Sequence, residues 1–205
     1  AENIETFPEG KISEKHIHDL HSEIEGPVIG EMQYYFLRDW AYVTKCDPMK
    51  LLSKKSFFPD PIERGASVMR IIASGPGQSY EACQKLFLTA ASTARRYLWI
   101  VTPYFVPDKP FIIALKMAVA RNVDVRIVIP QNNNHWYVRM ASSSLYDTLL
   151  DTGVRIFEKK GAFSHAKAMF VDGTWAAMGS SNCDVRSFRL NYELDFTIQG
   201  GEFMR

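Results

Sequence analysis

The most constraining feature of the sequence is a two-residue turn, Asp172-Gly173, between two short runs that both read as β-strands. An Asp-Gly pair in that setting is the strongest short-range signal for a β-hairpin. If these two residues alone form the turn, His165 on the first strand faces Ser180 on the second. Lys167 shares a strand face with His165, because side chains alternate along a strand. The sequence therefore predicts a hairpin that brings an imidazole, an ammonium and a hydroxyl group together at its open end.

The open end of this hairpin carries the groups that a phosphoryl transfer needs. The imidazole of His165 can attack phosphorus or move a proton. The ammonium of Lys167 and the amide of Asn182 can hold the non-bridging oxygens as negative charge builds. No carboxylate cluster suited to magnesium accompanies them in the sequence, so we expect a covalent route that uses no metal ion and no other cofactor.

Asp172 is expected to have a structural role rather than a chemical one. It lies in the turn and has the opposite strand parity to His165 and Lys167, so its side chain points away from the open end. Aspartate in a turn commonly accepts hydrogen bonds from backbone N–H groups. We therefore expect Asp172 to stabilise its own turn.

The rest of the chain predicts an α/β fold. Segments that read as strands and helices alternate from residue 67, and from residue 166 the strands follow one another directly. Asp108 is placed to cap a helix with Pro110 in its first turn and Phe111, Leu115 and Ala118 on one face. This pattern is typical of a mixed sheet covered by helices. The expected strands are 67–74, 97–102, 123–129, 154–157, 166–171 and 192–198, and the expected helices are 79–94, 108–118 and 135–152.

Residues 1–65 read differently. A helix is expected over residues 28–45, and residues 46–65 have the composition of a linker, with repeated proline, glycine and charge. The side chains expected to be buried in this helix are Met32, Tyr35, Phe36, Trp40 and Val43.

Composition argues against several other classes of protein. The net charge of +1 does not suit a nucleic-acid binder held by bulk charge. The three cysteines form no C-x-x-C pair, which argues against a zinc knuckle or a disulfide framework. No apolar run approaches the roughly 20 residues of a membrane span. We therefore expect this fragment to be soluble, and any membrane contact to be peripheral or made by sequence outside it.

Together these residues resemble the signature of the phospholipase D superfamily, H-x-K-x(4)-D followed by G-S-x-N. The chain is most similar to the C-terminal half of bacterial cardiolipin synthase, with further likeness over residues 25–28, 36–40, 102–108 and 184–193. A close alternative is the group of viral and animal phospholipase-D-like proteins related to the endolysosomal exonucleases. The signature residues here are His165, Lys167, Asp172, Gly179, Ser180 and Asn182.

The resemblance implies a further carboxylate and a second motif. In the family the motif histidine becomes covalently phosphorylated or phosphatidylated, and a later glutamate supports it. The matching residue here is Glu193, which we expect to orient His165 from a strand beside the hairpin. Gly179 is expected to be structural. The family site needs two motifs related by a pseudo-two-fold axis, and this sequence contains one. The histidines at 16, 18 and 21 are no second copy, since none has a lysine two residues on.

A short internal echo suggests where the other motif lies. Residues 20, 24 and 26 match 194, 198 and 200 at a constant offset, which places Asp19 on Glu193. We interpret residues 19–26 as the last strand of a first repeat whose motif is upstream. Residues 1–65 are then a remnant of that repeat plus a helix and linker, and residues 66–205 are the catalytic half.

Two loops at expected strand ends are candidates for substrate contact. Tyr104 and Phe105 follow a buried strand, where ligands bind in α/β sheets, and can form a wall of the substrate pocket or belong to the core. The polar segment 131–136 follows the next strand. It is interpreted as a connecting loop, with Trp136 as a possible contact for substrate or membrane.

Three functional hypotheses follow. The first is a cardiolipin-synthase-like phosphatidyltransferase acting on phospholipid at the cytoplasmic face of a membrane, with this fragment inactive alone. The second is a nuclease or phospholipid hydrolase that assembles its site by homodimerisation. The third is a non-catalytic module, which the intact set of His165, Lys167, Asn182 and Glu193 argues against. The apolar stretch 102–106 favours lipid over nucleic acid, and whether His165 is nucleophile or general acid is open.

Overall fold

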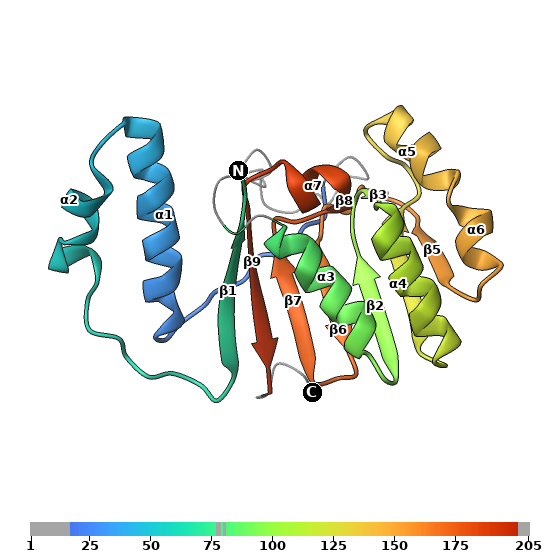
Figure 1. The fold of residues 1–205 in the computed structure, drawn as a ribbon, viewed down its shortest axis with the longest axis horizontal. Helices are drawn as coiled ribbons and strands as arrows, with labels where there is room; N and C mark the ends of the chain where they lie inside the picture. The colour runs from blue at the N-terminus through green and yellow to red at the C-terminus, as the bar shows by residue number, and fades with distance from the viewer. Residues whose placement is uncertain (1–16, 77–78, 80, 201–205) are drawn as a thin grey trace, which may run out of the picture.

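The computed structural model describes residues 17–76, 79 and 81–200, and its main element is a seven-stranded mixed sheet (Figure 1). Its strands are β1 (Val68–Ser74), β2 (Tyr97–Val101), β4 (Asp124–Pro130), β5 (Arg155–Lys159), β6 (Ala168–Val171), β7 (Trp175–Gly179) and β9 (Glu193–Gln199). They are ordered β1-β9-β7-β6-β2-β4-β5. The neighbours β2, β4 and β5 are parallel, and the other neighbouring pairs are antiparallel. The prediction of a mixed α/β sheet is confirmed.

Helices cover one face of the sheet and extend past both edges (Figure 1). In the view shown, α3 (Ala82–Thr93) and α4 (Lys109–Ala120) lie side by side in front of the sheet. Beyond the β1 edge lie α1 (Val28–Thr44), α2 (Pro48–Leu52) and the short 3₁₀ helix η1 (Lys55–Phe57). Beyond the β5 edge lie α5 (Trp136–Ser143) and α6 (Tyr146–Leu150). At one end of the strands sits α7 (Val185–Arg189), beside a two-stranded parallel ladder of β3 (Phe105–Val106) and β8 (Cys183–Asp184).

The start of α4 follows from local sequence signals. The Oδ1 atom of Asp108 accepts a hydrogen bond from the N–H of Phe111 at 3.2 Å, and Pro110 occupies the first turn, where no N–H partner is needed. Phe111, Leu115 and Ala118 are fully buried on one face, as their spacing predicts. This face of α4 packs against α3 and the sheet and forms part of the hydrophobic core.

Two of the expected elements are subdivided. The helix expected over 135–152 is two helices, α5 and α6, with a break at Ser144 and Leu145. The linker expected over 46–65 contains α2, which Asp47 caps through the N–H of Met49, and η1.

Helix α1 forms where predicted, but the prediction of its buried face was wrong. Its buried residues are Leu37 and Ala41, whereas Phe36, Trp40 and Val43 are exposed. Among the described helices and strands, α2 and β1 make the most contacts with this helix. One narrow stripe is therefore covered, and the aromatic side chains remain on the surface.

The motif hairpin forms with a register one residue away from the prediction. Val171 pairs with Trp175 and Ala168 with Met178, so Thr174 belongs to the turn. Asp172 and Gly173 have φ values of 57° and 72°, and the N–H of Thr174 donates to the carbonyl of Val171. The third turn residue moves Ser180 out of the position opposite His165. The residues before β6 and after β7, which include His165 and Ser180, still lie at the same end of the two strands.

The segment predicted to be the last strand of a first repeat is not a strand here. Residues 19–25 have no strand assignment, and the single bridge of this segment joins His18 to Ser164. That bridge fixes the segment beside the loop that leads into β6. Part of the predicted remnant, residues 1–16, lies outside the described residues.

Candidate functional site

His165 is held from both sides by residues distant in the sequence. Its N–H donates to the carbonyl of His18 at 2.7 Å, and the N–H of His18 donates to the carbonyl of Phe163 at 2.8 Å. The next residue along the N-terminal segment, Asp19, places Oδ2 3.0 Å from Nδ1 of the imidazole. This contact orients the ring through Nδ1.

Lys167 lies against the same imidazole, and the hairpin brings the two side chains together. Its Nζ is 3.1 Å from Nδ1 and 3.2 Å from Nε2 of His165, and it donates to the carbonyl of His165 at 2.7 Å. Burial lowers the pKa of Lys167, and the nearby carboxylates of Asp19, Glu193 and Asp195 oppose that shift. The ammonium is thus a partly desolvated positive charge beside Nε2, which suits an anionic oxygen.

Glu193 begins β9 and is buried, but its hydrogen bonds go to other residues than the one expected. Its Oε1 accepts from the hydroxyl of Ser187 at 2.7 Å and from Nδ2 of Asn191 at 3.0 Å. Its Oε2 accepts from the hydroxyl of Ser180 at 2.5 Å. The carboxylate hydrogen-bonded to His165 is that of Asp19. The direct orienting role expected of Glu193 therefore falls to Asp19 in this structure.

Ser180 and Asn182 flank the buried Ser181 and have different surroundings. Ser180 is exposed. Its N–H donates to the carbonyl of Leu194, and its hydroxyl accepts from the N–H of Leu194 and donates to Glu193. Asn182 is half-buried, and among the described residues its Oδ1 atom is buried without a hydrogen-bond partner. A buried polar atom without a partner costs about 1–3 kcal/mol. The atom is an acceptor, so only a donor group could satisfy it, and an anionic oxygen would have to be bound by the Nδ2 group of the same amide.

The sequence reasoning missed Asp195, which underlies the Gly-Ser-Ser-Asn loop. Its side chain is 4% exposed and accepts bonds from the N–H of Ser181 at 3.1 Å and from the Ser181 hydroxyl. Burial raises the pKa of Asp195 to about 6, although the Ser181 bonds act in the opposite direction. Its position two residues after Glu193 on one strand, and so on the same face, was the available signal.

Asp172 is structural, but it serves a neighbouring loop rather than its own turn. Its carboxylate accepts from the N–H groups of Arg95, Arg96 and Tyr97, at 3.0, 2.7 and 2.9 Å. Burial alone would raise the pKa of this group, but the three backbone bonds outweigh it and lower the pKa. Asp172 thereby fixes the hairpin turn to the start of β2, remote from the reacting groups.

Of the two aromatic residues proposed for substrate contact, only Tyr104 lies near the imidazole. Its ring centroid is 6.3 Å from that of His165, and its hydroxyl donates to Oδ1 of Asn134 at 2.9 Å. Phe105 is 1% exposed and belongs to the hydrophobic core, so its expected contact with substrate is wrong. The two side chains point to opposite sides because they are adjacent in an extended segment.

The polar segment 131–136 is more than a connection. Nδ2 of Asn133 donates to the carbonyl of Pro103 at 3.1 Å, and Asn134 binds Tyr104. Trp136 begins α5. The segment therefore fixes α5 beside the aromatic wall of the site.

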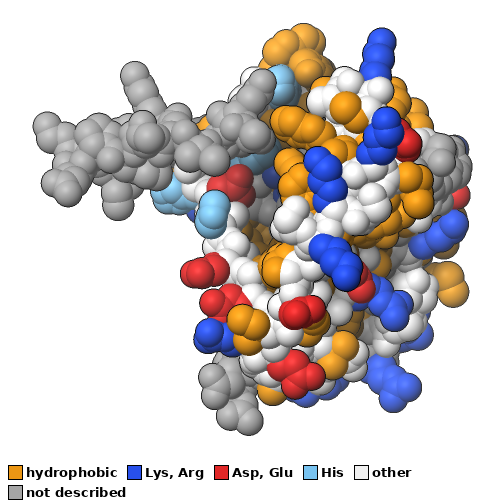
Figure 2. Space-filling view, turned by 90° about the vertical axis from the view of Figure 1, so that its left-hand side faces the viewer, with side chains coloured by type: hydrophobic (Ala, Val, Ile, Leu, Met, Phe, Trp, Pro, Cys, Tyr) orange, Lys and Arg blue, Asp and Glu red, His pale blue; other side chains and the backbone are white. Residues whose placement is uncertain are grey.

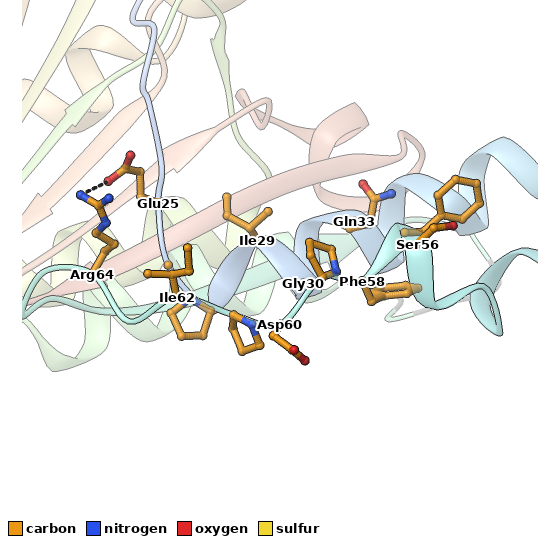
Figure 3. A pocket seen from close by; sticks show the side chains of 14 residues that line it. Glu25, Ile29, Gly30, Gln33, Ser56, Phe58, Asp60, Ile62 and Arg64 are labelled. Atoms are coloured by element: carbon orange, nitrogen blue, oxygen red, sulfur yellow. Dashed lines mark ion pairs between the residues drawn. The ribbon is translucent and has the colours of Figure 1, made fainter.

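A separate groove lies between α1 and residues 56–64 (Figure 3). Ile29, Phe58 and Ile62 line it, and an ion pair between Glu25 and Arg64, 3.6 Å long, stands at one end. None of the residues around His165 contributes to its walls. This groove is therefore separate from the candidate site around His165.

Comparison with known proteins agrees with this geometry. Residues 87–205 match the family model described as cardiolipin synthase, PLD-like domain. The chain belongs to this family. It is 38% identical to cardiolipin synthase of Geobacillus thermodenitrificans (strain NG80-2) over 178 residues, which are 86% of this chain and 35% of that protein. It is 40% identical to cardiolipin synthase A of Pseudomonas putida (strain GB-1) over 176 residues, 86% of this chain and 36% of that protein. This family member thus spans about a third of the length of these curated relatives.

Solved structures share the fold of this cardiolipin synthase family member at low identity. The phospholipase D family member Nuc from Salmonella typhimurium superposes with a TM-score of 0.55 at 22% identity, over 68% of this chain and 87% of that one. Phosphatidylserine synthase from Haemophilus influenzae Rd KW20 superposes with a TM-score of 0.54 at 15% identity, over 70% of this chain and 37% of that one. Both support a phospholipase-D-like sheet.

The described part of the chain has neither a membrane-spanning helix nor a cluster of metal-binding side chains. Within residues 17–76, 79 and 81–200, no helix is long and apolar enough to cross a membrane. The same residues contain no group of three or more His, Cys, Asp or Glu side chains arranged to hold a metal ion.

Proposed function

We propose that this chain supplies one half of the active site of a cardiolipin-synthase-like phosphatidyltransferase that works through a covalent phosphohistidine-type intermediate. The observation that carries the proposal is the setting of His165. Its Nδ1 lies 3.0 Å from the Asp19 carboxylate, and the Lys167 ammonium lies 3.2 Å from its Nε2. An imidazole that a carboxylate orients and that has a cation beside its ring is prepared to handle an anionic phosphodiester.

The proposed reaction exchanges one alcohol for another on phosphorus. Nε2 of His165 attacks phosphorus, a P–N bond forms, and the P–O bond to the leaving alcohol breaks. The leaving oxygen takes a proton from an acid on the second motif. The acceptor alcohol then gives its proton to that group and attacks phosphorus, which breaks the P–N bond and frees Nε2. Lys167 and Asn182 bind the non-bridging oxygens throughout.

The same contacts suggest how two halves share their carboxylates. Asp19, from the segment interpreted as the end of a first repeat, orients His165 of the second. By the same symmetry, we expect Glu193 to orient the histidine of the other motif, and the bonds from Ser180, Ser187 and Asn191 that hold its carboxylate support this. The fragment alone lacks that histidine, and we expect it to be inactive by itself.

Replacement of His165 in the two-motif protein tests this function. His165→Ala should abolish transfer between phosphatidylglycerol molecules, measured as cardiolipin formed in detergent-lipid micelles. His21→Ala, a change of an exposed histidine on the same N-terminal segment, is the matched control and should leave the rate unchanged. Asp19→Asn should lower the rate by at least about tenfold, because misorienting a catalytic group costs that much or more. Transfer at the normal rate by His165→Ala would refute the proposal.

Mapping the covalent adduct assigns the role of His165 within the pair. Rapid acid-free quenching and peptide mass spectrometry should find a phosphatidyl or phosphoryl group on His165 if it is the nucleophile. An adduct on the histidine of the other motif would make His165 the general acid. The balance of atoms in the reaction is the same in both cases.

A second candidate function is a phosphodiesterase assembled from two copies of the chain. The observation that favours it is the superposition on Nuc, since this chain covers 87% of that protein. It predicts a two-fold dimer with the His165 side chains facing each other. Light scattering that shows a monomer, together with no hydrolysis of a phosphodiester, would remove it.

A further inference from the structure

We propose that the outer face of α5 docks on an anionic phospholipid bilayer and holds the mouth of the His165 site at the level of the lipid phosphates. This α5 face consists of Trp136, Tyr137, Arg139 and Met140. The inference rests on the proposed function, because it names the surface through which that site would meet its lipid substrate.

The α5 face is apolar and exposed on an otherwise ordinary amphipathic helix. Trp136 is 72% exposed and Met140 65% exposed, and Tyr137 and Arg139 are also exposed. The opposite side of the helix, with the buried Ser142, rests against the molecule beside β3. Tryptophan and tyrosine favour the boundary between water and hydrocarbon, because each has an apolar body and a polar tip.

A continuous series of rings joins the α5 face to the proposed reacting group. The ring centroids of His165 and Tyr104 are 6.3 Å apart, and those of Tyr104 and His135 are 5.8 Å apart. His135 is followed at 5.4 Å by Tyr137, and Tyr137 at 6.0 Å by Trp136. A lipid held at Trp136 therefore has an aromatic path toward His165. No such path would be needed if α5 were only a surface helix.

Charge around the α5 face complements an anionic surface. Residues 125–146 and 159–171 contain no aspartate or glutamate, and they include Arg139, Lys160 and Lys167. The two segments are joined by a bond from the N–H of Gln131 to the carbonyl of Lys159, at 2.9 Å. Of the acidic groups nearby, Asp19 contacts His165 and Glu158 accepts from the Tyr146 hydroxyl, whereas Asp147 on α6 is exposed and Asp184 lies in the β3–β8 ladder. Basic residues beside a membrane strengthen binding to anionic lipid.

The other exposed apolar surface, on α1, has a different character. Figure 2 views the molecule from the α1 side, where hydrophobic side chains are interrupted by acidic and basic ones. Trp40 and Phe36 lie 6.0 Å apart on this helix, which also carries Glu31 and Asp39. It lies beyond the opposite edge of the sheet from α5 (Figure 1). Trp40 therefore offers a control: an exposed tryptophan on a helix that carries acidic as well as basic side chains and lies beyond the other edge of the sheet.

Vesicle binding of the 205-residue chain tests the surface without requiring chemistry. Sucrose-loaded vesicles of phosphatidylcholine mixed with phosphatidylglycerol are sedimented with the protein, beside vesicles of phosphatidylcholine alone. We expect binding to the anionic vesicles to be favoured. Trp136→Ala combined with Met140→Ala should weaken that binding by about tenfold or more. Arg139→Glu should weaken it by roughly tenfold on anionic vesicles and much less on neutral ones.

The controls decide between outcomes. Trp40→Ala should bind as the unchanged chain does, and the blue shift of tryptophan fluorescence on vesicles should disappear in Trp136→Phe and persist in Trp40→Phe. Equal binding by the Trp136→Ala, Met140→Ala variant, or an equal loss with Trp40→Ala, overturns the proposal. So does the absence of any binding to anionic vesicles.

These outcomes are separable from the fate of the proposed function. His165→Ala should bind vesicles normally, since the α5 face is intact. If His165→Ala also transfers normally in the two-motif protein, the function fails and the surface stands. If His165→Ala abolishes transfer while the α5 variants bind vesicles unchanged, the function stands and the surface fails.

Discussion

The region around β7 and β9 differs from α1 in how closely its side chains and glycines are packed. Around β7 and β9 the carboxylates of Glu193 and Asp195 each accept two or more hydrogen bonds, and Gly179 lies directly against the neighbouring strand. In α1 only Leu37 and Ala41 are buried, and Gly30 has open space around it. The difference shows that the conformation is tightly constrained around β7 and β9 and only loosely constrained in α1. The proposed site is built where backbone and side chains constrain one another, and α1 leaves most positions free to vary.

The largest expected effect comes from adding one methyl group at Gly179. A Cβ there would lie 2.5 Å from both the carbonyl oxygen of Leu194 and the Cα of Asp195. Both atoms belong to the backbone of β9, so β7 and β9 must move apart, and Gly179→Ala should destabilise the fold by about 3 kcal/mol or more. Urea unfolding followed by circular dichroism measures this. A loss below about 1 kcal/mol would mean that β7 and β9 separate easily and that this region is no more constrained than α1.

Removal of the Asp172 carboxylate should have the next largest effect. Asp172→Ala leaves the N–H groups of Arg95, Arg96 and Tyr97 without their acceptor, for an expected loss of about 2 kcal/mol. The pKa of Asp172 is lowered in the fold, so its stabilisation is present above its ordinary value of 3.8 and is lost as pH falls through the lower folded value. The difference from the unchanged chain should therefore narrow in acid. Asp47→Ala, which removes the carboxylate that caps α2 beside α1, is the comparison and should cost about 1 kcal/mol.

Features that depend on neighbouring residues in the chain could be predicted from the sequence. The Asp108 cap with Phe111, Leu115 and Ala118 follows from signals within one helix, and the prediction holds. The order of the elements and the presence of the hairpin were also predicted from local sequence signals. The prediction of the hairpin register was wrong because Thr174 is part of the turn. The pairing of β7 depends on β9 as well as on β6, and the turn sequence does not report on β9.

Contacts between distant parts of the chain were harder to predict. Asp19 and His165 are 146 residues apart, and only a short internal echo pointed to Asp19 at all. The exposed face of α1 was missed for a related reason: an apolar stripe predicts that something covers it, but not what or where. Trp40 and Phe36 had the composition of a core and lie on the surface.

A smaller effect, limited to one pH range, is expected at Asp195. Burial raises its pKa to about 6, so the fold favours the protonated form. Its stabilising contribution is full below the ordinary value of 3.8 and is lost as pH rises through about 6. Relative to Asp195→Asn, the unchanged chain should lose roughly 2 kcal/mol of stability between pH 4 and pH 7. Paired urea titrations across that range measure the difference, and parallel curves would show that Asp195 is ionised throughout.

The smallest expected effect has the opposite sign and lies in α1. A Cβ added at Gly30 meets no atom within 4 Å, and this glycine lies inside a helix with a negative φ. Alanine there reduces the backbone entropy of the unfolded chain without a steric cost, so Gly30→Ala should stabilise the fold by about 0.5–1 kcal/mol. The same urea titration used for Gly179→Ala measures it. Two glycine-to-alanine changes in one chain should thus move stability in opposite directions, because Gly179 faces backbone and Gly30 faces open space. A destabilised Gly30→Ala would mean that α1 is covered on that side by contacts additional to those of the described residues.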